Sequence, residues 1–165
     1  MKFIFFIVLN NYKTAMTAEI IIDQLDLKPH PEGGYYKRTY TDAQQRFSSI
    51  LFLLLKNNFS AFHRIRSEEQ WNWYLGDDII IHEIDHNGVY HQTILSGNTA
   101  KIQLQYVVKA GHWFASESIG NNGFALCGCT VVPAFHFDEF ELADREILTN
   151  LFPQHQQLIH TFTRK

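Results

Sequence analysis

The segment from His63 to Gly76 constrains this chain more than any other, because it spaces a histidine, a glutamate and a glycine along two expected β-strands. The glutamate is Glu69, which lies between His63 and Gly76. Neighbouring strands in the mouth of a small β-barrel bring such an imidazole and carboxylate together. A weaker second motif follows at residues 109–114 and contains His112. The two motifs together predict a small barrel with a pocket.

The composition fits one folded domain whose partner is a small molecule. The chain has 165 residues, of which 45% are hydrophobic and 15% aromatic, enough for a sizeable core. The formal net charge is −3 and no basic run is longer than two residues, so we expect no nucleic-acid partner. Cys127 and Cys129 are too close in sequence for a favourable mutual disulfide and cannot complete a zinc site, so buried free thiols are expected.

Residues 1–15 require a separate interpretation. Lys2 precedes the apolar run 3–9, which has the order of a signal peptide but is far too short to span a bilayer. We therefore expect no membrane partner. Met16 begins a segment that looks like a natural start. The preferred interpretation is that translation begins at Met16, or that residues 1–15 are a dispensable extension. On this interpretation the protein is expected to be cytoplasmic. A weak secretion signal is the alternative.

Short segments rich in β-forming residues recur along the chain and are predicted to be strands. They span 35–41, 47–55, 60–66, 70–75, 79–84, 89–95, 102–108, 112–115 and 124–132. Asn87 and Gly88 predict a tight hairpin between two of them. Prolines and glycines exclude regular structure from 25–34. This pattern predicts an antiparallel barrel or jelly roll.

Helices are expected only at the two ends of the domain, which we place at residues 17–152. The first spans 18–24 with Thr17 as its N-cap. The last element spans 143–152, with an apolar stripe made of Ile147, Leu148 and Leu151. Residues 153–165 are predicted to be a C-terminal tail.

His63 and Glu69 are the first candidates for chemistry. They could hold a divalent metal, but Ile65 and Phe114 occupy positions where further ligands would be needed. Two protein ligands bind a metal weakly, and His112 would substitute only in part. The sequence therefore favours a hydrogen-bonded polar pair beside a pocket, without a cofactor, over a metal site.

A rigid turn at residues 29–36 is the second candidate. Gly33 and Gly34 permit a close backbone approach that a Cβ would block. Glu32 in this turn could present its carboxylate to a ligand. The alternative, equally weighted, is a turn that only pins the first strand across the barrel.

Several side chains are predicted to line the pocket. Trp71 and Trp73 share strand parity with Glu69, although core packing is the commoner role of strand aromatics. Gln103 and Gln105 lie on a common face one strand away, and a glutamine inside a barrel requires polar partners. The remaining ligand-binding candidates are Arg64, for which a surface role is favoured, and His112.

The ordered motifs resemble an uncharacterised family of cupins that opens with Pro-His-Pro-Glu-Gly-Gly-Tyr-Tyr. The matching segments are 29–36, 62–64, 67–76, 105–111, 128–135 and 138–141, and they cover roughly residues 17–152. The chain departs from the pattern at Glu68, Asn72, Lys109 and Ala134. The resemblance implies a double-stranded β-helix, often a homodimer, similar in fold to sugar-nucleotide epimerases.

The predicted function is isomerisation or epimerisation of a carbohydrate-like or keto-acid ligand without a metal. In this prediction His63 is the base, Glu69 orients it, and Glu32 or Tyr36 donates a proton. A non-catalytic small-molecule binding protein is the main alternative. A metal-dependent cupin enzyme with His63 and Glu69 as ligands is the third.

Overall fold

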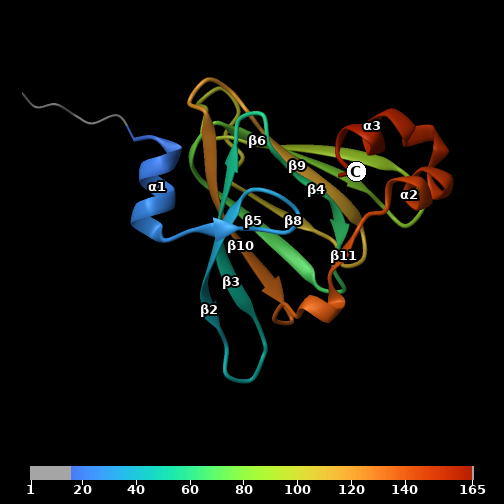
Figure 1. The fold of residues 1–165 in the computed structure, drawn as a ribbon, viewed down its shortest axis with the longest axis horizontal. Coiled ribbons are helices and arrows are strands. Elements are labelled where there is room, and N and C mark those ends of the chain that lie inside the picture. Colours follow the sequence, from blue (N-terminus) through green and yellow to red (C-terminus); the bar gives the residue numbers. More distant parts are fainter. Residues whose placement is uncertain (1–15, 165) are drawn as a thin grey trace, which may run out of the picture.

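The computed structural model describes residues 16–164 of the chain. In this part, two antiparallel β-sheets pack face to face and short helices flank them (Figure 1). This arrangement confirms the predicted all-β jelly roll with helices at its ends. No helix within 16–164 is long and apolar enough to cross a membrane. The expectations for residues 1–15 lie outside the described residues.

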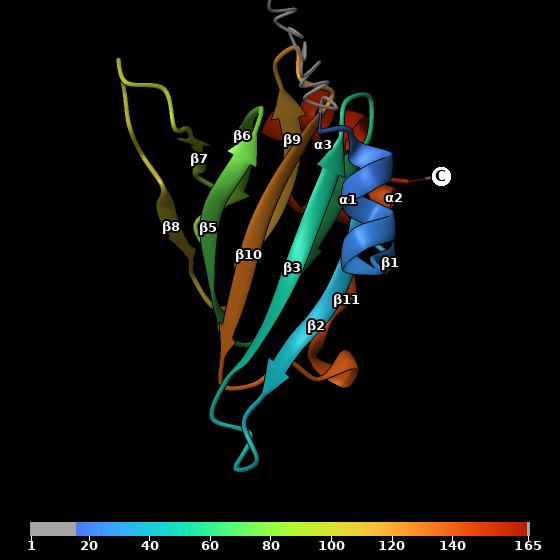
Figure 2. The same ribbon diagram turned by 90° about the vertical axis from the view of Figure 1, so that its left-hand side faces the viewer.

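The first sheet faces the viewer in Figure 2 and has the strand order β1–β2–β3–β10–β5–β8 within the described residues. Its strands are β1 (Lys28–Pro29), β2 (Tyr35–Thr41), β3 (Ser48–Leu55), β5 (Glu68–Gly76), β8 (Gln105–Val108) and β10 (Phe124–Val132). The bounds of β2 and β10 agree with the prediction. The short β1 lies within 25–34, where no regular structure was expected. Pro29 is tolerated there because β1 is an edge strand.

The second sheet has the order β11–β4–β9–β6–β7 within the same residues. Its strands are β4 (Phe59–Arg64), β6 (Asp78–Ile84), β7 (Tyr90–Leu95), β9 (Trp113–Ile119) and β11 (Glu141–Leu142). The predicted Asn87–Gly88 hairpin joins β6 to β7, which pair from Ile79–Leu95 to Ile84–Tyr90. His63 of β4 and Glu69 of β5 are each fixed by a strand with paired neighbours, whereas His112 directly precedes β9.

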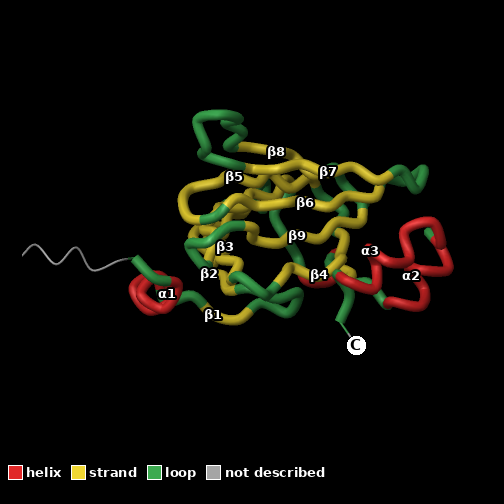
Figure 3. Tube along the Cα trace, turned by 90° about the horizontal axis from the view of Figure 1, so that it is seen from above, coloured by secondary structure: helices red, strands yellow, loops and turns green. Residues whose placement is uncertain are grey.

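Helices cover the outer faces of both sheets, at opposite sides of the molecule in Figure 3. They are α1 (Ala18–Leu25), α2 (Arg145–Leu151) and α3 (Gln156–Thr161), with 3₁₀ turns η1 (Phe137–Glu139) and η2 (Pro153–His155). Thr17 caps α1 as predicted, because the Ile20 amide donates to its Oγ1 at 3.4 Å.

The main core fills the space between the sheets. Phe52, Trp71, Ile81 and Phe114 are among its fully buried side chains. A second cluster joins the outer face of β4, β6 and β9 to α2 and α3, and a third joins α1 to β3 and β10. Both cysteines are buried and free, as expected.

The C-terminal segment differs from the prediction in two ways. Leu148 is buried, but Ile147 and Leu151 are 69% and 57% exposed, so the predicted stripe of α2 is wrong. The chain also continues past Phe152 into η2 and α3, so α2 is not the last element. Ile159 of α3 is fully buried against the second sheet, which holds this segment in place.

Candidate functional site

A small cavity lies between the two sheets, and buried ionisable side chains form part of its lining. Its volume is about 40 Å³. The lining includes a polar group, His30, Glu32, His63, Glu69 and Cys129, and an aromatic group, Tyr36, Phe52, Phe135, Phe137 and Phe140. A few polar groups in an otherwise apolar cavity are typical of small-molecule sites.

The turn that precedes β2 carries Glu32 to the cavity. Gly33 and Gly34 have φ angles of +113° and +72°, a conformation that favours glycine. A Cβ on Gly33 would lie 2.2 Å from the Phe59 carbonyl oxygen. The Glu32 carbonyl accepts a hydrogen bond from the Ala61 amide at 2.8 Å. The two glycines therefore let the turn pack directly against β4 and fix Glu32 there.

The Glu32 carboxyl has one hydroxyl donor and two histidine neighbours. Ser60 Oγ donates to Oε1 at 2.8 Å. Oε2 lies 3.2 Å from His63 Nε2 and 3.4 Å from His30 Nδ1. Glu32 is 6% exposed and His63 2% exposed, so water cannot solvate a charge on either group.

Glu32 and His63 form a buried acid–base pair, with Oε2 and Nε2 3.2 Å apart. His63 Nδ1 is 2.7 Å from the Ala61 carbonyl oxygen, which only accepts, so Nδ1 carries a hydrogen. A neutral His63 then presents the lone pair of Nε2 to Glu32, and a hydrogen bond between them requires a second proton. Burial raises the pKa of Glu32 and lowers the pKa of His63. The form of the pair in which both groups are neutral is therefore favoured.

Glu69 of β5 is the second acidic group of the cavity. Burial raises its pKa to about 7, while His63 lowers it and Glu32 raises it. A hydrogen bond with Cys129 lowers the pKa of Glu69 further. Burial also raises the pKa of the Cys129 thiol, so the thiol stays protonated as a donor. Glu69 can thus exchange a proton near neutral pH.

The fold and this geometry agree with a known family. Residues 19–143 match the family model described as Cupin superfamily (DUF985). The chain belongs to this cupin family. No curated protein matches it.

Two solved structures of similar length support the assignment. A protein from Shewanella oneidensis is 34% identical with a TM-score of 0.84, and the match covers 90% of this chain and 98% of that one. A hypothetical protein from Leishmania major is 30% identical with a TM-score of 0.85, over 91% of this chain and 100% of that one.

Oxalate decarboxylase from Bacillus subtilis is a more distant match. A variant of that enzyme, in which tyrosine replaces one tryptophan, is 12% identical with a TM-score of 0.59, over 86% of this cupin and 39% of that chain. At this identity the likeness shows the fold alone.

The side chains at two positions where further metal ligands were expected do not fit an ion. Ile65 lines the cavity where a second ligand of the first motif would lie, and Phe114 packs against His63 with the rings tilted and their centroids 4.0 Å apart. Neither side chain can donate to a metal. Within residues 16–164, no group of three or more His, Cys, Asp or Glu is arranged to hold an ion.

Tyr36 lines the cavity, whereas the two tryptophans have other environments. The Tyr36 ring contacts the His30 ring edge-on, with centroids 4.5 Å apart. Trp71 is 1% exposed in the main core, which agrees with the core role considered for it. Trp73 packs against that core, and its Nε1 donates to the Asp77 carbonyl at 2.8 Å.

The predicted polar ligand-binding residues lie away from the cavity lining. Gln105 is exposed and its Nε2 donates to Asn72 Oδ1 at 2.8 Å, because β8 turns the side chain of Tyr106 inward instead. Gln103 forms a backbone bridge with Ser96. Arg64 pairs with Glu141 at 2.7 Å and stacks over Trp113. These three residues are therefore not part of this site.

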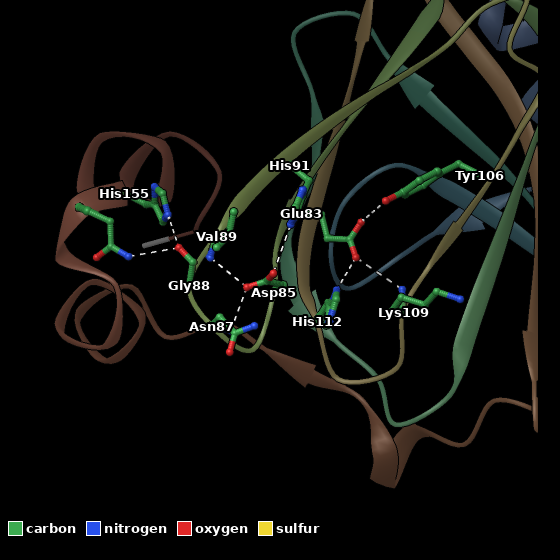
Figure 4. Close-up of polar contacts among 11 residues, drawn as sticks. Glu83, Asp85, Asn87, Gly88, Val89, His91, Tyr106, Lys109, His112 and His155 are labelled. Carbon is green, nitrogen blue, oxygen red and sulfur yellow. Dashed lines mark hydrogen bonds and ion pairs between the residues drawn. The ribbon is translucent and has the colours of Figure 1, made fainter.

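His112 belongs to a different cluster, centred on Glu83 of β6 (Figure 4). His112 Nδ1 and the Lys109 amide both lie within hydrogen-bonding distance of Glu83 Oε1, the latter at 3.5 Å. Tyr106 Oη donates to Glu83 Oε2 at 2.6 Å. Burial, followed by Glu83 itself, raises the pKa of Tyr106 to about 12, so it remains a donor.

Sequence reasoning did not assign three of the cavity residues to the site. His30 was treated as part of a rigid turn, although it lies two residues before Glu32. Cys129 was predicted to be a buried thiol without a role. Arg38 was not considered, although its strand parity matches that of Tyr36, and this parity was the available signal.

Proposed function

We propose that this cupin catalyses metal-independent proton transfer on a small carbonyl compound, as an isomerase or epimerase of a carbohydrate-like or keto-acid ligand. The observation that carries the proposal is the buried contact between Glu32 and His63, beside a cavity and a second carboxyl whose pKa is raised to about 7. Two acid–base groups whose environments separate their protonation states are the arrangement that such chemistry needs.

In the proposed reaction Glu69 acts as the base. Its carboxylate removes the proton next to the substrate carbonyl, while the protonated Glu32 carboxyl gives its proton to the carbonyl oxygen. An enediol forms, Glu69 becomes neutral and Glu32 becomes a carboxylate. The cavity therefore keeps the same net charge throughout, which avoids the cost of creating a new buried charge. Glu69 then gives its proton to the other carbon or the other face, and an enediol hydroxyl gives its proton to Glu32 as the carbonyl forms again.

Hydrogen–deuterium exchange at substrate carbon tests this proposal. Pyruvate, 2-oxobutyrate, dihydroxyacetone and glyceraldehyde in D₂O would serve as probes, with ¹H NMR as the readout. We expect exchange of at least one probe, and a loss of about 10²- to 10⁴-fold in Glu69→Gln and His63→Gln. Glu68→Gln, the exposed neighbour that pairs with Lys109, is the matched control and should exchange at the wild-type rate.

A chelator separates this proposal from a metal-dependent reaction. Exchange that survives EDTA supports the metal-free assignment, whereas exchange that EDTA removes and added metal restores would sink it. A probe that binds and is released without exchange would favour a non-catalytic binding protein. Homodimer formation and a cytoplasmic location stay predictions, which light scattering and cell fractionation would test.

A further inference from the structure

We infer that the ligand carries an anionic group, a carboxylate or a phosphate, which binds at Arg38 while an uncharged carbonyl end enters the cavity. This inference rests on the proposed proton-transfer function, because it names the class of compound on which that chemistry acts.

Arg38 has unused donors beside the cavity. Its Nη1 lies 3.4 Å from Thr41 Oγ1 and 3.5 Å from the Phe135 carbonyl oxygen, both long hydrogen bonds. A guanidinium has five N–H donors, so most of them stay available. Within residues 16–164, the ion pairs made by lysine and arginine do not include Arg38. The side chain is therefore a positive charge without an acidic partner in this part of the chain.

A surface groove extends outward from Arg38 and carries a further positive charge. It shares Arg38, Tyr36, Phe135 and Phe137 with the cavity, and it adds Asp26, Lys28, Lys37 and His136. Asp26 is the acidic member of this lining and pairs with Lys28. Lys37 and Arg38 then leave a net positive charge along the groove.

The inner end of the cavity has the opposite preference. Glu69, the proposed carboxylate base, lies there, and a ligand anion beside it would meet a like charge in a dry environment. Burial lowers the pKa of His30, and the Arg38 charge contributes to that lowering, so the field of Arg38 reaches this end. A ligand with a neutral carbonyl inside and an anion outside satisfies both ends.

The chemistry of Arg38 explains why the anion is a carboxylate or a phosphate. A planar guanidinium donates two parallel N–H groups to either oxyanion, which gives orientation as well as affinity. Such an orientation would place the carbon next to the carbonyl toward Glu69 and His63. The cavity volume of about 40 Å³ restricts the part of the ligand beyond the anion to a few atoms.

Three probes that differ in charge test the inference. Dihydroxyacetone phosphate supplies a phosphate, pyruvate a carboxylate, and dihydroxyacetone no charge. Binding would be titrated by saturation-transfer NMR at low salt, and C–H exchange in D₂O followed in the same samples. We expect an anionic probe to bind at least about tenfold more tightly than dihydroxyacetone, and Arg38→Met to lose about tenfold. Lys101→Met, which removes an exposed charge from the β7–β8 loop, should not change binding.

The outcomes separate this inference from the proposed function. Preference for phosphate or for pyruvate identifies which anion the site takes. Equal binding of dihydroxyacetone, an unaltered Arg38→Met, or no binding by any probe overturns the inference. Arg38-dependent binding without exchange supports the anion site and contradicts proton transfer. Exchange of an anionic probe whose affinity and rate Arg38→Met leaves unchanged supports proton transfer and contradicts the anion site.

Discussion

Two similar acidic clusters, centred on Glu32 and Glu83, lie in one barrel. They differ in the number of hydrogen-bond donors that surround each glutamate. Each glutamate is buried beside a histidine. Glu83 has a phenol, an imidazole and a backbone amide within hydrogen-bonding distance (Figure 4). Glu32 has one hydroxyl donor and lies near two histidines, of which His63 has already given its Nδ1 hydrogen to a carbonyl.

This comparison teaches that residue type alone does not define an acid–base site. A carboxylate with enough donors is stabilised as a fixed structural element, because its charge is compensated. A carboxyl with too few donors retains a proton that it can transfer, particularly when a cavity adjoins it. Glu32 lines the cavity and Glu83 is not among its lining residues. The following predictions test this distinction.

The largest change in the free energy of unfolding is expected when the Glu83 carboxylate is removed. Glu83→Ala leaves Tyr106 Oη and His112 Nδ1 without their acceptor in the interior, which should lower the free energy of unfolding by about 3–5 kcal/mol. Urea unfolding measures this change. In Glu83→Gln the amide oxygen still accepts, so the loss should be smaller. If Glu83→Ala unfolds like the wild type, the structural role of this cluster is refuted.

A pH-dependent effect of intermediate size is expected at Glu69. The pKa of Glu69 is about 7 in the folded protein, against 4.5 for a free glutamate, which stands for the unfolded chain. Between pH 4.5 and pH 7 the folded state therefore binds more protons than the unfolded state. The folded state loses stability as the pH rises through this window. Glu69→Gln removes this loss. The variant should exceed the wild type by up to about 3 kcal/mol at pH 8, and the gap should close toward pH 5.

Urea unfolding at pH 5, 6.5 and 8 would measure the Glu69 effect. The difference between the two proteins isolates Glu69 from the buried histidines, whose lowered pKa values act in the opposite direction. Glu68→Gln, which changes an exposed ion pair, should shift stability by less than about 1 kcal/mol at each pH. A gap for Glu69→Gln that widens toward acid pH would contradict the assigned direction.

A smaller gain in stability is expected from Glu32→Gln. The new amide can donate to the His63 Nε2 lone pair and accept from Ser60 Oγ, so the pair no longer requires the extra proton. We expect the free energy of unfolding at pH 7 to stay equal or to rise by about 1 kcal/mol. Proton exchange on substrate should nevertheless be lost. Thermal unfolding and the D₂O assay on the same sample would separate these two effects.

The sequence predicted the barrel well because strand patterns are local. Residues 35–41 and 124–132 alternate or run apolar over a strand's length, and Asn87–Gly88 marks a hairpin. The terminal helix was harder to interpret. Ile147 and Leu151 look like part of a buried stripe in the sequence, yet both are exposed. The second sheet is covered instead by Leu148 of α2 and by α3.

The candidate site could be predicted only in part. The unusual motifs single out Glu32, Tyr36, His63 and Glu69 as candidates, and the structure places these four side chains around one cavity. Whether a histidine shares a proton depends on what its second nitrogen contacts. His63 and His112 have the same side chain, but a carbonyl fixes one and Glu83 holds the other. That difference arises from tertiary contacts that no local pattern encodes.

The smallest expected effect is at Gln105, which was predicted to line the pocket and instead lies exposed on β8. Gln105→Ala removes one hydrogen bond to Asn72 that is open to water, so stability should change by less than about 0.5 kcal/mol. Probe binding and proton exchange should match the wild type. Tyr106→Phe on the next position of the same strand faces inward and should cost about 1–2 kcal/mol, because Glu83 loses a donor. Should the two variants have equal effects, the assignment of β8 faces, and with it the contrast between the two clusters, would be incorrect.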